Sequence, residues 1–161
     1  YRAAILDCVR ALDFLTTSPK VDPKRIAITG GSQGGLLSFA TAALDKRIIL
    51  CAPDIPFVMD SMRSFEITNW PGSIIRQWVG RSPENNTWQK AGNTMKYVDP
   101  KNLANLIECP VFMGVCLQDK AAPPFCAFAA LKSFFISFPA SFVIAELHLC
   151  HCEVVLSVRK I

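Results

Sequence analysis

A serine between closely spaced glycines is the first feature of this chain that could do chemistry. Residues 25–35 read RIAITGGSQGG, which places Gly30, Ser32 and Gly34 in the pattern G-x-S-x-G. In a nucleophile elbow this pattern joins a strand to a helix, and the glycines remove Cβ atoms that would collide with neighbouring backbone. The turn also points the serine hydroxyl out of the sheet. Ser32 is therefore the predicted nucleophile.

The residues after Ser32 predict a helix of small side chains, from about Gln33 to Leu44. The first N–H groups of a helix lack partners within it and form the positive end of its dipole. An oxyanion that develops beside Ser32 could use them, so the Gln33 N–H is the predicted oxyanion donor. An incidental serine in a glycine-rich turn, or a phosphate-binding loop, is the alternative. Neither G-x-x-x-x-G-K-[ST] nor G-x-G-x-x-G matches here.

A serine nucleophile needs a base, and the base needs a carboxylate that orients it. The two histidines, His148 and His151, both follow the last apolar run that we interpret as a strand. Asp119 is the favoured acid, because one strand and one helix separate it from His148 and its loop is rich in proline. Asp54 is the alternative acid, and Asp119 could also be a surface-turn aspartate.

The segment His148–Cys152 reads HLCHC and could also be interpreted as metal ligands. A zinc site of this kind needs a second cluster with short spacing. Cys109 and Cys116 have six residues between them and lie on a predicted buried strand, so they do not supply it. We therefore predict no metal and no cofactor.

Apolar runs of strand length alternate with helical patterns along the chain. This alternation predicts an α/β fold, with a mostly parallel sheet that has helices on both faces. Active sites of such sheets lie beyond the carboxyl ends of the strands, where Ser32, Asp54, Asp119 and His148 are all expected. The predicted strands are 25–29, 48–52, 109–116 and 142–147, and the predicted helices are 3–15, 33–44, 125–138 and a short one after Glu153.

Length and composition predict one domain. The 161 residues are 51% hydrophobic and 19% charged, which is enough for one sizeable core. Residues 55–108 are more polar and richer in Asn, Trp and Pro, so we expect a cap-like insertion there. Because the chain starts at Tyr1 without an initiator Met or leader pattern, we expect residues 1–161 to be a single partial domain that is truncated at its N-terminus.

Charge and hydropathy argue against two classes of partner. The net charge of +4 is scattered rather than gathered into a stripe, so nucleic acid is not an expected partner. The longest uncharged stretch of the most apolar region, Ser133–Ala145, has 13 residues, and a membrane span needs roughly 20.

The seven cysteines lie mostly in apolar segments, which indicates buried thiols and favours the cytoplasm, although any targeting segment is not observable.

Longer stretches of the sequence match one family. The motif GGSQGG at 30–35 is followed far downstream by LQD at 117–119 and by PP at 123–124. Residues 1–131 resemble the acetyl xylan esterase and cephalosporin-C deacetylase family of carbohydrate esterases, which are α/β-hydrolases. The matching segments are 1–15, 21–35, 51–57, 97–104, 109–119 and 123–130.

This resemblance implies an α/β-hydrolase domain with Ser32 as nucleophile and Asp119 as acid. It implies removal of acetyl groups from acetylated xylo-oligosaccharides or cephalosporin-type esters, without a metal and as a homo-oligomer, commonly a hexamer. The second oxyanion donor of the family would lie upstream of Tyr1. The family's closing Gly-His-Glu is not reproduced, but His148 follows Asp119 by 29 positions, the separation expected from the family, so we favour it over His151.

Two alternatives remain at this point. One is another hydrolase on the same scaffold, a peptidase or a short-chain esterase, because G-x-S-x-G does not select the acyl group. The other is a catalytically inactive fragment.

Overall fold

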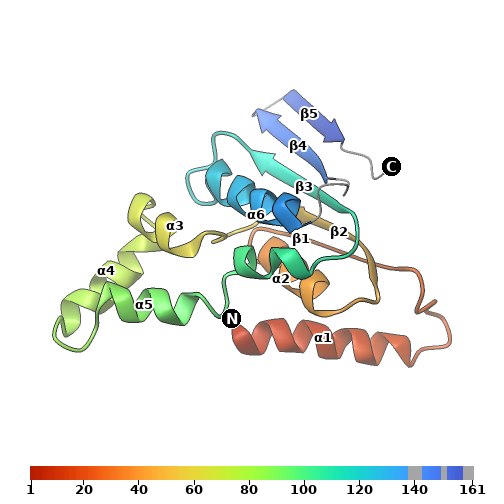
Figure 1. Cartoon of the computed structure of the whole chain (residues 1–161), viewed down its shortest axis with the longest axis horizontal. Coiled ribbons are helices and arrows are strands. Elements are labelled where there is room, and N and C mark those ends of the chain that lie inside the picture. Colours follow the sequence, from red (N-terminus) through yellow and green to blue (C-terminus); the bar gives the residue numbers. More distant parts are fainter. Residues whose placement is uncertain (138–142, 150–151, 158–161) are drawn as a thin grey trace.

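A five-stranded sheet forms the centre of the molecule, with the strands in the order β1-β2-β3-β4-β5 (Figure 1). The computed structural model describes residues 1–137, 143–149 and 152–157, with side chains described up to Ser133. The strands are β1 (Ile26–Gly31), β2 (Ile48–Asp54), β3 (Val111–Cys116), β4 (Val143–Leu149) and β5 (Cys152–Ser157). The first four run parallel, as predicted, and β5 is antiparallel to β4.

The helices that alternate with these strands were predicted closely. The small-residue helix α2 (Gln33–Leu44) has the expected bounds, and α1 (Arg2–Thr16) and α6 (Pro124–Ser137) differ from the prediction by one residue at each end. The remaining helices are α3 (Ser61–Ile67), α4 (Gly72–Arg81), α5 (Trp88–Met95) and the 3-10 helix η1 (Pro100–Leu106). The main helices of the chain could therefore be located from the sequence pattern alone.

One face of the sheet carries the core. Helix α2 packs against β1 and β2, α6 packs against β3, and η1 packs against both helices, while α1 packs on α2. Phe39 of α2, Met113 of β3 and Ile107 just after η1 are all 0% exposed within this layer. These contacts fix the helix that begins at Ser32 against the two strands that end beside it.

The other face of the sheet is more open in the part of the chain that the structure describes. Ala27 and Thr29 of β1 are exposed, and Leu50, which pairs in register with Ala27, is 39% exposed. The sequence predicts helices on both faces, whereas the described helices that contact β1, β2 and β3 belong to the single layer of α2, η1 and α6.

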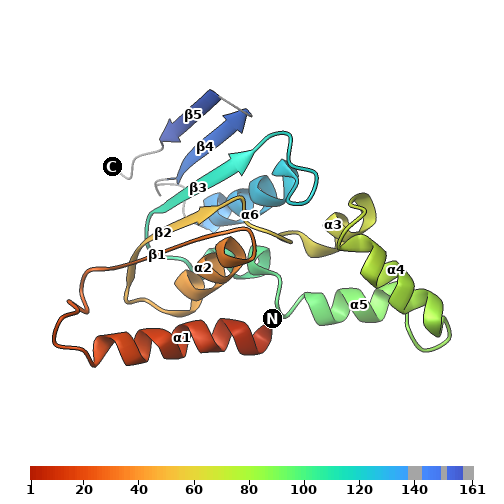
Figure 2. The ribbon, with the colours of Figure 1, turned by 180° about the vertical axis from the view of Figure 1, so that it is seen from behind.

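Helices α3, α4 and α5 form an arm that extends away from the sheet, and we call residues 61–95 the excursion (Figures 1 and 2). The excursion lies within the range expected for a cap-like insertion. Helix η1 lies in the same range, yet it belongs to the core layer, because Ala104 and Ile107 are completely buried there.

The carboxyl end differs from the prediction. Residues 152–157 form strand β5 rather than a helix. The β-branched pair Val154 and Val155 suits a strand, and β5 supplies hydrogen-bond partners to the edge of β4 that would otherwise be open. Strand β4 also extends to Leu149, so His148 lies within the strand rather than after it.

Candidate active site

Ser32 occupies the corner between β1 and α2. Its φ of 53° and ψ of −114° are rare for a residue with a side chain. Three backbone hydrogen bonds hold this conformation: the Ser32 N–H donates to the Asp54 carbonyl (3.0 Å), and the Ser32 carbonyl accepts from Leu36 N–H (3.1 Å) and Phe57 N–H (3.0 Å). Ser32 itself is exposed. The corner thus presents a hydroxyl from a strained and firmly held backbone.

The glycines of the corner are needed where backbone segments meet. A Cβ atom on Gly30 would lie 2.7 Å from the carbonyl carbon and oxygen of Gly34, so the prediction for Gly30 is confirmed. A Cβ atom on Gly34 would meet nothing within 4 Å, so the collision predicted there is wrong. The second crowded position is Gly35, whose Cβ would lie 2.8 Å from the Asp54 carbonyl oxygen. The reason is that Gly35 faces the end of β2, whereas Gly34 contributes the backbone that Gly30 meets.

Gln33 is the first residue of α2, directly after the N-cap residue Ser32. Its N–H therefore belongs to the first turn, where a helix offers no internal acceptor. The Gln33 side-chain amide donates to the Tyr1 hydroxyl at 3.5 Å, which turns the side chain towards the start of α1. Gln33 remains the predicted oxyanion donor, through its main chain.

Asp119 lies in a tight turn three positions after the end of β3. Its N–H donates to the Cys116 carbonyl at 3.3 Å. Its Oδ1 accepts the N–H groups of Ala121 (2.7 Å) and Ala122 (2.9 Å). Two donors on one oxygen fix the plane of a carboxylate, which is what the orienting acid of a triad needs. Asp119 remains the predicted acid.

Asp54, the alternative acid, is the last residue of β2. Its main chain accepts the Ser32 N–H, and its carboxylate lies against Gly114 of β3. A Cβ atom on Gly114 would lie only 2.1 Å from Asp54 Oδ1. Gly114 was not among the predicted site residues, although a lone glycine inside an apolar strand signals such a close approach. Asp54 therefore supports the corner through its backbone.

His148 lies on the same sheet edge but not beside Ser32. In β4 it pairs in register with Cys116 of β3 and with Glu153 of β5. Strands β2 and β3 lie between β1 and β4, so a spacing of about 4.8 Å per strand puts the His148 backbone roughly 14 Å from the end of β1. Its side chain is beyond the described side chains, and His151 lies outside the described residues.

The buried thiols of the core are not alternative nucleophiles. Burial raises the pKa of the Cys51 and Cys109 thiols and raises that of Cys126 to about 11, so these thiols stay protonated at neutral pH. Within residues 1–137 and the described strands β4 and β5, no three His, Cys, Asp or Glu residues gather as metal ligands. In the same part of the chain, no helix combines the length and apolarity that a membrane span requires.

The parallel sheet, the strained serine at the β1–α2 corner and the aspartate after β3 define an α/β-hydrolase. A model of the acetyl xylan esterase family (AXE1) matches residues 1–138. The chain belongs to this family. Its sequence is 39% identical over 117 residues to the acetyl esterase Axe7A of Xylanibacter ruminicola.

Solved structures agree with the family assignment. The acetyl xylan esterase from Paenibacillus sp. R4 superposes with a TM-score of 0.83 at 38% identity over 92% of this chain. Acetyl xylan esterase 1 from Thermoanaerobacterium sp. JW/SL YS485 superposes with a TM-score of 0.74 at 29% identity over 89% of this chain.

The chain is shorter than these relatives. It spans 26% of the Xylanibacter protein, and it covers 46% and 44% of the two solved chains.

Proposed function

We propose that this chain carries the nucleophile and the acid of a serine esterase that removes acetyl groups from acetylated xylo-oligosaccharides or cephalosporin-type esters. The observation that carries the proposal is the backbone of Ser32, whose φ of 53° is held by hydrogen bonds to two neighbouring segments. Such strain is retained where the geometry of a reacting group requires it. The family assignment supports the acetyl ester as the bond that would be cleaved.

In the proposed mechanism, Ser32 Oγ attacks the acetyl carbonyl while a histidine removes the hydroxyl proton. The Gln33 N–H stabilises the oxyanion that forms, with help from the positive end of the α2 dipole. The sugar oxygen leaves with the proton from the histidine, and water then hydrolyses the acyl-enzyme in the same manner. Asp119 orients the histidine and stabilises its charged form.

His148 is the proposed base. Replacing His148 and His151 separately by Ala tests this assignment, because only the base variant should lose activity by several orders of magnitude.

Hydrolysis of p-nitrophenyl acetate by the whole chain tests the function directly. Ser32→Ala should lower kcat by roughly a factor of 10⁶, because the nucleophile is lost while the fold is kept. Ser18→Ala is the matched control, since Ser18 lies in the connection from α1 to the amino end of β1, whereas Ser32 follows its carboxyl end, and should leave kcat unchanged. Activity that survives in Ser32→Ala would contradict the proposal.

A further inference from the structure

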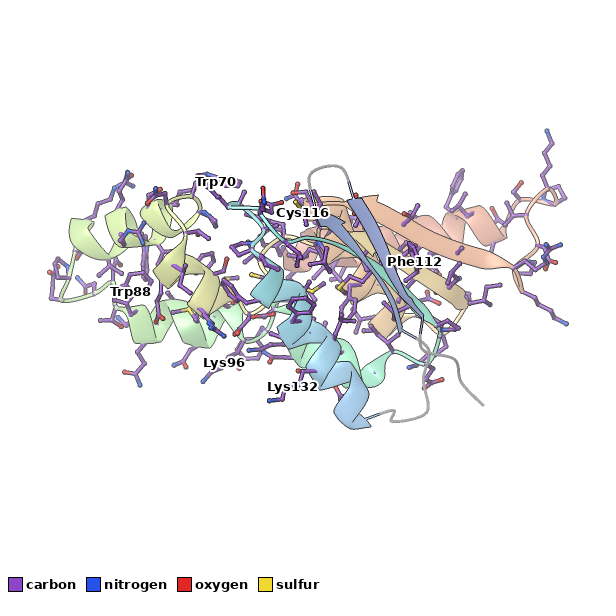
Figure 3. The ribbon with its side chains drawn as sticks, turned by 90° about the horizontal axis from the view of Figure 1, so that it is seen from above. Trp70, Trp88, Lys96, Phe112, Cys116 and Lys132 are labelled. Atoms are coloured by element: carbon purple, nitrogen blue, oxygen red, sulfur yellow. The ribbon has the colours of Figure 1, made fainter. Side chains whose placement is uncertain are left out.

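A cleft of about 420 Å³ lies where the excursion meets the loop after β3. One wall is the segment 67–70, which joins α3 to α4, and the other wall directly follows Asp119. Figure 3 shows Trp70 at the inner end of the excursion, on the side where Cys116 ends β3. The lining residues are Ile67, Thr68, Asn69, Trp70, Lys120, Ala121 and Pro123. The cleft therefore borders the predicted acid.

Phe57 links this cleft to the nucleophile corner. The N–H of Phe57 donates to the Ser32 carbonyl at 3.0 Å, and the ring of Phe57 stacks on Trp70 with centroids 5.1 Å apart and planes 23° apart. Phe57 is buried, whereas Trp70 is 56% exposed. The indole is thus held through its contact with Phe57 and leaves much of its surface open to a ligand.

The wall that carries Trp70 is held in place by α4. The Arg76 guanidinium donates to the carbonyls of Phe65 (3.0 Å), Thr68 (3.1 Å) and Asn69 (3.3 Å). Gly72 lets α4 approach, because a Cβ atom there would lie 2.1 Å from the Phe65 carbonyl oxygen. A wall that is ordered before binding avoids the entropic cost of ordering it on the ligand.

We propose that this cleft binds a sugar ring of an acetylated oligosaccharide, with Trp70 as the platform on which the ring stacks. The inference rests on the proposed function, because the sugar is the leaving group of that reaction and must lie next to the acyl group. A pyranose has an apolar C–H face and a polar rim. The indole of Trp70 matches the face, and the side chains of Asn69 and Lys120 supply hydrogen-bonding groups at the rim.

Calorimetric titration of the whole chain with xylotriose, which carries no acetyl group and is not turned over, tests the site. Trp70→Ala should raise Kd by about tenfold, and Trp70→Phe, which keeps a flat ring, by about threefold or less. Tyr97→Ala is the matched control: Tyr97 is 86% exposed just after the excursion and lies outside the cleft, so Kd should not change. A Trp70→Ala chain that binds like wild type, an equal loss in Tyr97→Ala, or a wild-type chain that does not bind would overturn the inference.

Two further measurements separate folding and function from the sugar site. Asn69→Ala leaves the Trp70 stack intact and should raise Kd by about threefold, which keeps the test decisive if Trp70→Ala fails to fold. Hydrolysis of ethyl acetate, which has no sugar ring, should keep its kcat/KM in Trp70→Ala. Binding that depends on Trp70 without any ester hydrolysis would overturn the proposed function alone. Hydrolysis with sugar binding that is independent of Trp70 would overturn the sugar site alone.

Discussion

The Ser32 corner and the excursion are built by different kinds of contact. The corner is held by backbone hydrogen bonds and by glycines whose missing Cβ atoms let two segments meet. The excursion is anchored by polar side chains: the buried carboxylate of Asp99 accepts hydrogen bonds from Asp60 N–H, from the N–H and hydroxyl of Ser61, and from Lys101 N–H. Backbone contacts hold the reacting group, whereas side-chain hydrogen bonds hold the excursion that surrounds it.

Replacing each of the two candidate acids by its amide should give the largest difference in activity. Asp119→Asn should lower kcat for p-nitrophenyl acetate by about 10⁴, because an amide cannot orient and stabilise the charged histidine. Asp54→Asn should lower kcat by no more than about tenfold, because the corner uses the main chain of Asp54. The assignment of the acid would be wrong if Asp54→Asn caused the larger loss.

Two separate glycine substitutions test whether the corner depends on close backbone contact. Gly30→Ala should lower the free energy of unfolding by about 3 kcal/mol, because the new Cβ would lie 2.7 Å from the Gly34 backbone. Gly31→Ala should change it by less than about 0.5 kcal/mol, because that Cβ would meet nothing within 4 Å. Urea denaturation measures both. Equal losses of unfolding free energy in the two variants would show that the corner does not depend on the close approach of Gly30 to Gly34.

The same measurement tests the buried carboxylate of Asp99, which anchors the start of the excursion. Asp99→Ala should lower the free energy of unfolding by about 2 kcal/mol, because it leaves several donors without an acceptor. Asp7→Ala removes a carboxylate whose ion pair with Arg10 is exposed, and should cost no more than about 0.5 kcal/mol. If Asp99→Ala were as mild as the control, the excursion would need another anchor.

The smallest predicted effect concerns the carboxyl end of α2, where Asp45 and Arg47 form an ion pair. Hydrogen bonds from Arg47 lower the pKa of Asp45, so this pair stabilises the fold at neutral pH and loses its contribution as the pH falls through the lowered pKa. Asp45→Asn should therefore cost about 1 kcal/mol at pH 7. The difference in the free energy of unfolding between Asp45→Asn and wild type should shrink below about pH 4. Urea denaturation at pH 7 and at about pH 3 measures this change. A difference that stays constant would exclude the ion pair as its cause.

The corner could be predicted from the sequence because its requirements are local. Gly30, Ser32 and the small residues of α2 lie within a short stretch, so the pattern itself reports the geometry. The Asp99 cluster joins residues 38 and 39 positions apart, and the close approach of Asp54 to Gly114 joins neighbouring strands, so neither leaves a local pattern. Strand β5 was predicted as a helix because its conformation depends on the open edge of β4.

Reaction of the whole chain with a fluorophosphonate, followed by mass spectrometry of the modified peptide, tests directly whether Ser32 is an activated nucleophile. We expect the label to bond covalently to Ser32 Oγ, and Asp119→Asn to slow the labelling. A chain that stays unlabelled at Ser32, or that is labelled at another serine instead, would contradict the claim that this corner presents an activated nucleophile.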